Sequence, residues 1–593
     1  MSEAKKQSEE AIEIDENGKV AEKAKVEEKT PPKPIAVKGE SRLKRFANWY
    51  KTGKKKSIPL TVLLLLLILA AIPFSRYALA GTFLKNSYSV EVIDSTAGTA
   101  ISGADVSLGN IHGITNGSGK VTLNKVGVGH KQLLVSKKYY RDQSAKVLVP
   151  ILKQKNVPKY QLTATGRQVK VSVKNLINHT SLADVNISVA DISAKTDKSG
   201  SAILVLPAGT KSEKAKLSLD GYNNADATIQ VDDKSIKEND FNLTPSGKVY
   251  FLSKLSGKID VVKTNLDGTG RQTVLPGTGH EDDQNTVLLA SRDWKYLALQ
   301  SRRSGNSPSL YLIDTSNDSL TTIESDSVNF SLLGWSDNFF TYTTSRSNNQ
   351  PWQPGAQSIK SYNAQTKKLA TLDSTNATGT SLSDANYETY IIQPILLDNL
   401  LAYVKTWYQY PGYLQVTGQS NTLSVIKPDG GGKKTIKSVD ASQSYFGSMV
   451  FHAPSSVYVQ MSNINGTSST YYEFNGTGLA QKNLTNDDVF RTYPTYLYSP
   501  DDSSTFWTEP RDGKNTLFIG DEQGLSGKQI ASLTDYKPYG WFTSDYLLVS
   551  KNSSELYIMP KGGLDDKAQP VKITDYHKPA QNFFGYGGGY GGI

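Results

Sequence analysis

A unit that repeats along the C-terminal half of the chain constrains the fold more than any other feature. Seven copies begin near residues 247, 288, 332, 393, 448, 494 and 539. Each has a turn, usually with an Asp, followed by an apolar strand and further short strands. A period of about 40–50 residues is typical of a four-stranded blade. Because one blade alone would expose its apolar face, we expect the copies to close into a seven-bladed β-propeller over residues 245–578.

The turns that open these units also carry a family resemblance. Ser499-Pro-Asp-Asp and Ser291-Arg-Asp resemble the WD40-like repeats of TolB and prolyl-oligopeptidase-type propellers, whereas the fifth unit has His452-Ala-Pro-Ser instead. An Asp in such a turn bonds to backbone N–H groups, so we interpret it as structural. Ring closure usually joins the two chain ends in one blade, for which residues 247–253 and the segment after 570 are candidates. The similar peptidases carry a serine-peptidase domain, but the sequence contains no G-x-S-x-G motif.

Two similar β patterns precede the propeller, at residues 86–164 and 167–243. Ile101–Leu108 in the first matches Leu182–Val189 in the second, and an Asn116 turn matches an Asp197 turn. The order of strands and turns resembles carboxypeptidase regulatory-like and PEGA-type modules. This resemblance implies two Ig-like β-sandwiches of seven strands each, which act as spacers or adhesion units. The expected fold class is therefore all-β, with one N-terminal transmembrane helix.

A membrane anchor is expected at residues 58–80. Ile58–Phe74 carries no charge, and the residues up to Ala80 lengthen it enough to cross a hydrocarbon core of about 30 Å. Lys and Arg residues between Arg42 and Lys56 favour a cytoplasmic N-terminus. We expect a disordered cytoplasmic tail at residues 1–57 and an exported remainder, at a bacterial cell membrane. The alternative is a signal peptide cleaved after Ala80, since Ala78-Leu79-Ala80 has the small-x-small form.

Composition excludes several classes of function. The net charge is +10, of which residues 1–57 hold +5, so the exterior is nearly balanced and we expect no nucleic-acid partner. The absence of Cys excludes disulfides and thiolate chemistry. The six His residues lack zinc-site spacing, and we expect no metal, no cofactor and no catalytic residues. Residues 579–593 form a Gly/Tyr-rich tail.

Two long loops suggest a binding patch on the propeller. They lie in the third and fourth units, and equivalent loops of neighbouring blades emerge on one face. Their aromatic residues could meet there beside amide side chains: Trp352, Trp407, Tyr408, Tyr410 and Tyr413. Tyr and Trp combine an apolar body with a polar tip, which suits a glycan, a peptide or an envelope protein. The alternative is that these loops only cover the rim.

We therefore expect a membrane-anchored extracytoplasmic binding or scaffold protein and not an enzyme. Its propeller would bind a ligand or envelope partner, and the two sandwiches would form a stalk. The alternative is an envelope hydrolase, glycosidase or peptidase-like, with a site in the propeller channel. Such a glycosidase would need two carboxylates about 5–9 Å apart in a cleft.

Overall fold

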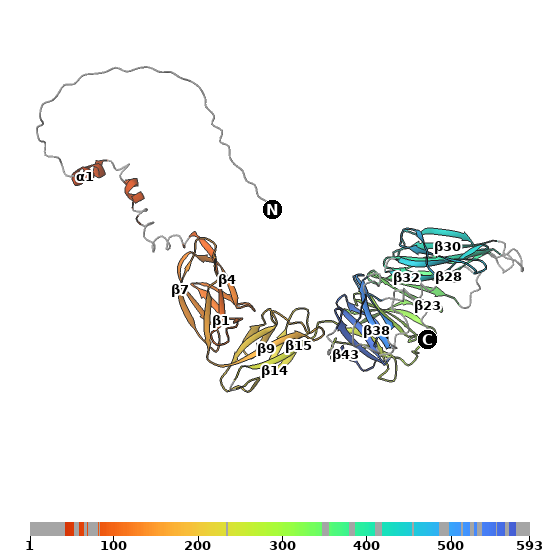
Figure 1. The fold of residues 1–593 in the computed structure, drawn as a ribbon, viewed down its shortest axis with the longest axis horizontal. Helices are drawn as coiled ribbons and strands as arrows, with labels where there is room; N and C mark the ends of the chain where they lie inside the picture. The colour runs from red at the N-terminus through yellow and green to blue at the C-terminus, as the bar shows by residue number, and fades with distance from the viewer. Residues whose placement is uncertain are drawn as a thin grey trace, which may run out of the picture. The chain divides into compact units, whose positions relative to one another are not determined.

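The computed structural model describes most of the chain beyond residue 83. The described residues are 42–52, 58–64, 68, 81, 83–232, 235–346, 355–378, 386–409, 418–453, 456–485, 497–511, 514–521, 527–529, 536–552, 554–563 and 569–576. They are nearly all-β, as expected, beside helix α1 (Arg42–Thr52) (Figure 1). Two compact units are distinguished, Met1–Phe83 and Leu84–Ile593.

The predicted N-terminal and C-terminal segments are only partly covered. Across the described stretches, the structure contains no helix with the length and apolar character needed to span a bilayer. Residues 65–67 and 69–80 of the predicted anchor lie outside the described residues, as do residues 1–41 and the tail 579–593. The anchor therefore stays a prediction.

The first β-domain packs two four-stranded sheets, β4-β1-β8-β6 and β3-β2-β5-β7, around one core. Its strands are β1 (Lys85–Asp94), β2 (Asp105–Leu108), β3 (Ile111–Ile114), β4 (Lys120–Gly127), β5 (Gly129–Ser136), β6 (Tyr140–Arg141), β7 (Gln143–Val149) and β8 (Lys159–Ala164). Alternation places Val90 and Val92 of β1 in the core. The domain has eight strands instead of the expected seven, because Tyr140–Arg141 pairs with β8 as a short extra strand.

The second β-domain repeats this plan with seven strands, in sheets β11-β10-β13-β14 and β12-β9-β15. Its strands are β9 (Arg167–Asn175), β10 (Asn186–Val189), β11 (Ile192–Lys195), β12 (Ser201–Leu206), β13 (Ser212–Ser218), β14 (Ala225–Gln230) and β15 (Lys237–Leu243). In both domains the last strand pairs in parallel with the first, β8 with β1 and β15 with β9.

One buried threonine shows that the two β-domains are copies of the same structure. Thr115 Oγ1 donates to the Ile101 carbonyl at 2.6 Å and accepts from the Ala104 N–H at 2.9 Å. Thr196 Oγ1 donates to the Leu182 carbonyl at 2.6 Å and accepts from the Val185 N–H at 2.9 Å. The same pair of bonds closes the same loop in each domain.

Seven antiparallel sheets then follow one another, and the seven sequence units fall on them. The first three sheets are β16 (Val249–Ser253), β17 (Asp260–Thr264), β18 (Gln272–Leu275); β19 (Val287–Ala290), β20 (Tyr296–Ser301), β21 (Ser309–Asp314), β22 (Ser319–Glu324); and β23 (Asn329–Ser336), β24 (Phe339–Ser345), β25 (Gln357–Asn363), β26 (Lys368–Ser374).

The fourth sheet has five strands and the remaining sheets have four. They are β27 (Ala377–Thr378), β28 (Asn386–Leu397), β29 (Leu400–Gln409), β30 (Gly418–Ile426), β31 (Lys434–Asp440); β32 (Ser444–Ala453), β33 (Ser456–Asn463), β34 (Ser469–Phe474), β35 (Leu479–Lys482); β36 (Leu497–Tyr498), β37 (Ser504–Arg511), β38 (Lys514–Asp521), β39 (Lys528–Gln529); and β40 (Tyr536–Thr543), β41 (Tyr546–Lys551), β42 (Glu555–Pro560), β43 (Val571–Thr574).

Shared apolar cores join each sheet to the next and make the array a ring. Separate cores connect the first sheet to the second, the second to the third and so on to the seventh. The ring closes where Val249 and Phe251 of the first sheet pack with Leu548 and Ile558 of the seventh. We call this junction the seam. The structure is therefore a β-propeller.

The seam is closed by side chains and not by a shared sheet. Among the described residues, β16 pairs with β17 alone and β43 with β42 alone, so the segments near residues 247–253 and after 570 do not complete one blade between them. The first sheet has only three strands. Trp294, in the turn before β20 of the second sheet, contacts the seventh sheet directly. Its Nε1 donates to the Trp541 carbonyl at 3.1 Å, and its ring centroid lies 5.8 Å from that of Phe542.

Candidate functional site

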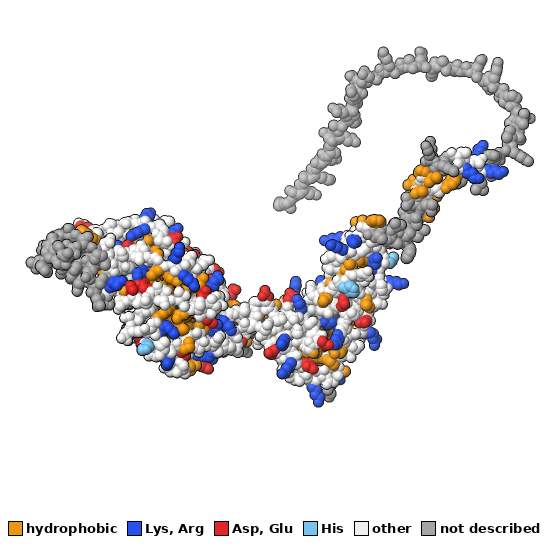
Figure 2. Space-filling view, turned by 180° about the vertical axis from the view of Figure 1, so that it is seen from behind, with side chains coloured by type: hydrophobic (Ala, Val, Ile, Leu, Met, Phe, Trp, Pro, Cys, Tyr) orange, Lys and Arg blue, Asp and Glu red, His pale blue; other side chains and the backbone are white. Residues whose placement is uncertain are grey.

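The turns that open the blades hold themselves together through aspartate, as the sequence predicts. Asp501 accepts from Ser499 Oγ at 2.6 Å and from the Ser503 N–H at 3.2 Å. Asp293 makes the matching bonds to Ser291 Oγ and the Lys295 N–H. These carboxylates are structural. Lys, Arg, Asp and Glu side chains are intermixed over the visible propeller surface in Figure 2, in keeping with its balanced charge.

Other charged residues of these turns converge from sheets that are not neighbours. Arg292, between β19 and β20, pairs through Nη2 with Asp502 Oδ1 at 2.7 Å, and its Nη1 donates to the Pro500 carbonyl at 3.4 Å. Asp502 lies between β36 and β37, in the sixth sheet. Because the second and sixth sheets are not adjacent, this ion pair crosses the centre of the ring.

Two further aspartates belong to the same group. Burial raises the pKa of Asp398, in the turn between β28 and β29, and the charges of Asp502 and Asp337 raise it further, while Arg292 opposes them. Asp337, between β23 and β24, is exposed and has a φ of 47°. We call Arg292, Asp337, Asp398 and Asp502 the ring-centre cluster. Three carboxylates against one guanidinium favour a cationic or hydrogen-bond-donating guest.

Sequence reasoning missed this cluster, because each turn was judged by itself and ring geometry decides which turns meet. One signal was present: Arg292 stands where the Ser499-Pro-Asp turn has Pro500. A long cationic side chain at an otherwise rigid turn position indicates a partner elsewhere.

The aromatic patch expected on the propeller lies mostly outside the described residues. Trp352, Tyr410 and Tyr413 are among those not described. Trp407 and Tyr408 lie near the end of β29, where Trp407 pairs with Glu388 and Ser420 and is half-buried. The structure does not bring the five residues together in its described part, so the patch remains a prediction.

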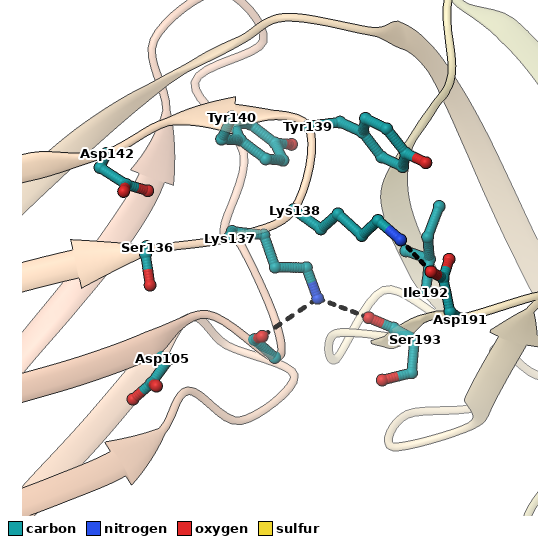
Figure 3. A pocket seen from close by; sticks show the side chains of 11 residues that line it. Asp105, Ser136, Lys137, Lys138, Tyr139, Tyr140, Asp142, Asp191, Ile192 and Ser193 are labelled. Atoms are coloured by element: carbon teal, nitrogen blue, oxygen red, sulfur yellow. Dashed lines mark hydrogen bonds and ion pairs between the residues drawn. The ribbon is translucent and has the colours of Figure 1, made fainter.

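A polar pocket of about 490 Å³ lies at the joint between the two β-domains (Figure 3). Lys137 Nζ donates to the Gly103 carbonyl at 3.1 Å in its own domain and to the Ser193 carbonyl at 2.6 Å in the second. Lys138 pairs with Asp191 across the same joint. Burial lowers the pKa of Lys137 to about 8. Because the Lys137 amine donates to backbone carbonyls of both domains, we interpret Lys137 as a structural residue that holds the two β-domains together.

Two buried acids bridge neighbouring blades. Glu324 ends β22 and contacts the third sheet, where Tyr342 donates to its Oε2 at 2.6 Å and Lys360 pairs with its Oε1. Burial and this hydrogen bond raise the pKa of Tyr342. Asp373 in β26 likewise accepts from Lys433 at 3.0 Å. Such pairs connect neighbouring sheets, so we assign them to the structure of the ring.

Over the described ranges, no three His, Asp or Glu side chains are placed to hold a metal ion.

Comparisons with known proteins give no information about which residues form a site. No family model and no curated protein matches the chain. Among solved structures, a prolyl endopeptidase is 12% identical with a TM-score of 0.33, covering 55% of this chain and 48% of its own length. An oligogalacturonate lyase from Vibrio parahaemolyticus is 9% identical (TM-score 0.29; 55% of this chain, 84% of that one). TolB from Acinetobacter baumannii is 13% identical (TM-score 0.25; 53% and 74%). Likenesses at these scores support no conclusion about function.

Proposed function

We propose that this chain is a membrane-anchored extracytoplasmic binding or scaffold protein. Residues 58–80 anchor it, with the N-terminus in the cytoplasm. The two β-domains, Ig-like sandwiches of the carboxypeptidase regulatory-like or PEGA type, form a stalk. The seven-bladed propeller is the binding head. Its ligand is an envelope partner: a peptide segment of another protein or a glycan.

The observation that carries the proposal is the ring-centre cluster. Four sheets contribute one charged residue each, and the carboxylates exceed the single Arg. Asp398 is half-buried and its pKa is raised, so it is poorly compensated by its surroundings. A basic side chain of a partner would supply the missing charge. The predicted aromatic patch, with Trp407 and Tyr410, would add apolar contact elsewhere on the head.

Binding of basic peptides tests this proposal. We would measure association of the full chain, held in lipid nanodiscs, with an array of Lys-containing peptides and their Lys-acetylated forms. The double variant Asp337→Asn/Asp398→Asn should lose at least about tenfold in affinity, since each carboxylate of the cluster attracts the basic ligand and also steers its association. The matched control is Asp226→Asn/Asp240→Asn, two exposed aspartates of the second β-domain with the same change in net charge.

The outcome that contradicts the proposal is clear. If acetylated and unmodified peptides bind equally, or both double variants behave alike, the ring centre is not the binding site. A parallel Trp407→Ala/Tyr410→Ala variant tests the aromatic patch, and unchanged retention of glycans and peptides would remove that patch from the proposal.

A hydrolase is the second candidate, because the ring centre holds an acid with a raised pKa beside other carboxylates. Asp398 would act as general acid, and Asp502 or Asp337 as its partner. Hydrolysis of envelope oligosaccharides that disappears in Asp398→Asn would favour it. The absence of turnover together with peptide binding would leave the binding proposal standing.

A further inference from the structure

One end of the first β-domain differs from the rest of its surface, and strand register defines it. Lys85 of β1 pairs with Gly127 of β4, and Gly129 of β5 pairs with Val149 of β7. Residues 84–86, 125–131 and 148–152 therefore meet at one end of the sandwich, and residues 153–157 continue the third segment from there along β1, where Gln154 bonds to Ser89. We call it the lysine-rich end.

The charges at this end have a single sign. The three segments contain Lys85, Lys125, Lys131, Lys153 and Lys155, and they contain no Asp or Glu. The opposite end of the same domain carries both signs, because Asp105 and Asp142 line the pocket at the joint together with Lys137 and Lys138. Lysine without neighbouring acidic residues in the same segments is therefore a feature of the end where the chain enters the domain.

Large apolar side chains are exposed among these lysines. Leu152 is 80% exposed, Ile151 51%, and Leu84 49%. Figure 2 shows blue and orange side chains together at this end of the domain. A soluble surface rarely displays neighbouring Ile and Leu at such exposure, and apolar residues rimmed by charge mark an interaction site.

The loop that carries Ile151 and Leu152 is held in place from β1. Asn86 Nδ2 donates to the Pro150 and Leu152 carbonyls, each at 2.9 Å. Gln154 Oε1 accepts from the Ser89 N–H at 2.7 Å, and its Nε2 donates to the Ser89 carbonyl at 2.9 Å. Asn86 thus holds the loop's backbone at Pro150 and Leu152, and the Gln154 side chain ties the loop to the backbone of β1 just after Leu152. The apolar side chains are thus presented outward by a fixed backbone.

We propose that the lysine-rich end docks on the membrane surface, with Ile151 and Leu152 in the headgroup region and the lysines on anionic phospholipid. The proposal rests on the anchor of the proposed function. Leu84 follows Ala80 by four positions in the chain, which limits the distance between them to about 14 Å. Apolar tips ringed by Lys fit an anionic lipid interface better than an apolar protein groove. The first β-domain then stands on the bilayer through its own surface as well as through the tether.

The cysteine-free chain permits a direct test with single cysteines. Full-length Leu152→Cys, labelled with an environment-sensitive fluorophore, is placed in nanodiscs of anionic lipid that contain spin-labelled lipid quencher. Ile114→Cys is the matched control, because Ile114 is 71% exposed and pairs with Asp105, away from the lysine-rich end. We expect quenching at position 152 to exceed that at 114 by about twofold or more, and Lys153→Glu/Lys155→Glu to remove most of the difference.

A label at Ile68, inside the predicted anchor, separates two kinds of failure. If position 68 is quenched and position 152 behaves like 114, the docking inference falls while the anchor stands. If position 68 is not quenched, the proposed anchor itself falls. A blue-shifted label at 152 that lipid quencher does not touch indicates a protein partner or second copy, and overturns the inference. Quenching equal in zwitterionic and anionic discs contradicts the role of the lysines.

Discussion

The seam offers the sharpest test of how the propeller closes. Trp294 lies in a turn of the second sheet, yet it contacts Trp541 and Phe542 of the seventh. If the three-stranded first sheet leaves a gap that this indole fills, then Trp294→Ala should loosen the junction between the first and seventh sheets more than any other part of the ring.

The magnitude follows from the contacts. A half-buried indole removes roughly 100 Å² from water, about 2.5 kcal/mol at 25 cal/mol/Å². The hydrogen bond to the Trp541 carbonyl adds about 1 kcal/mol. The contact with the Phe542 ring adds about 0.5–1 kcal/mol. We expect Trp294→Ala to cost about 4 kcal/mol.

Backbone conformation supplies an internal control. Trp294 has a φ of 58°, in the left-handed region. Ala keeps that strain and Gly relieves it, so Trp294→Gly should be about 1 kcal/mol less destabilising than Trp294→Ala although both remove the same contacts. This reverses the order found at ordinary positions.

Hydrogen exchange on the full chain is the assay, because it assigns opening free energies to individual segments. In Trp294→Ala, exchange should accelerate most in β16 and β41. Trp335→Ala, which removes a buried indole bonded to the Leu289 carbonyl between the second and third sheets, should accelerate exchange there instead. A cost below about 1 kcal/mol, or equal effects of both variants at β16, would refute the account of the seam.

Three further predictions concern the ring and the joint. Glu324→Gln should lower the free energy of unfolding in urea by about 3–5 kcal/mol, because it leaves the half-buried Lys360 charged and without its carboxylate partner. Adding Lys360→Met should recover part of this loss, and no recovery would contradict the pairing. Gly117→Ala should lower the free energy of unfolding in urea by about 1–3 kcal/mol, because a Cβ at this position would lie 2.4 Å from the Thr196 carbonyl oxygen. Gly478→Ala is the control and should leave the free energy of unfolding unchanged, because a Cβ there would meet no atom within 4 Å. The pKa of Lys137 is about 8 in the folded protein and 10.5 for an ordinary lysine, so the unfolded chain binds more protons between these pH values. The free energy of unfolding of the wild type should therefore rise with pH, relative to that of Lys137→Met, between pH 8 and pH 10.5 and not below pH 8. A difference that does not change with pH would show that the amine is not desolvated.

Local patterns were sufficient to predict the sheets. Alternation along residues 86–93, and the matched turns at Asn116 and Asp197, depend on neighbours in the sequence, and the structure shows equivalent hydrogen bonds at Thr115 and Thr196. The seven repeat units likewise coincide with seven sheets.

Features that depend on distant segments could not be predicted in the same way. The three-stranded first sheet and the reach of Trp294 to Trp541 follow from ring closure, which joins residues far apart in the chain. The ion pair of Arg292 and Asp502 spans 210 positions for the same reason. In the sequence Lys137 cannot be distinguished from an ordinary surface lysine, because its partner, the Ser193 carbonyl, belongs to the second β-domain. The aromatic patch depends on loops that mostly lie beyond the described residues.

The parallel pairing of first and last strands in both β-domains has a mechanical consequence. A pull along the chain drags β1 and β8, or β9 and β15, in opposite directions along their length, so their hydrogen bonds are loaded in shear and must break together. Antiparallel hairpins pulled from their open ends would unzip one bond at a time. The register joins four residue pairs in the first domain and seven in the second. Under tension along the chain, the first domain should therefore rupture before the second, so the four-pair register of the first domain limits the force that the two β-domains can bear in series.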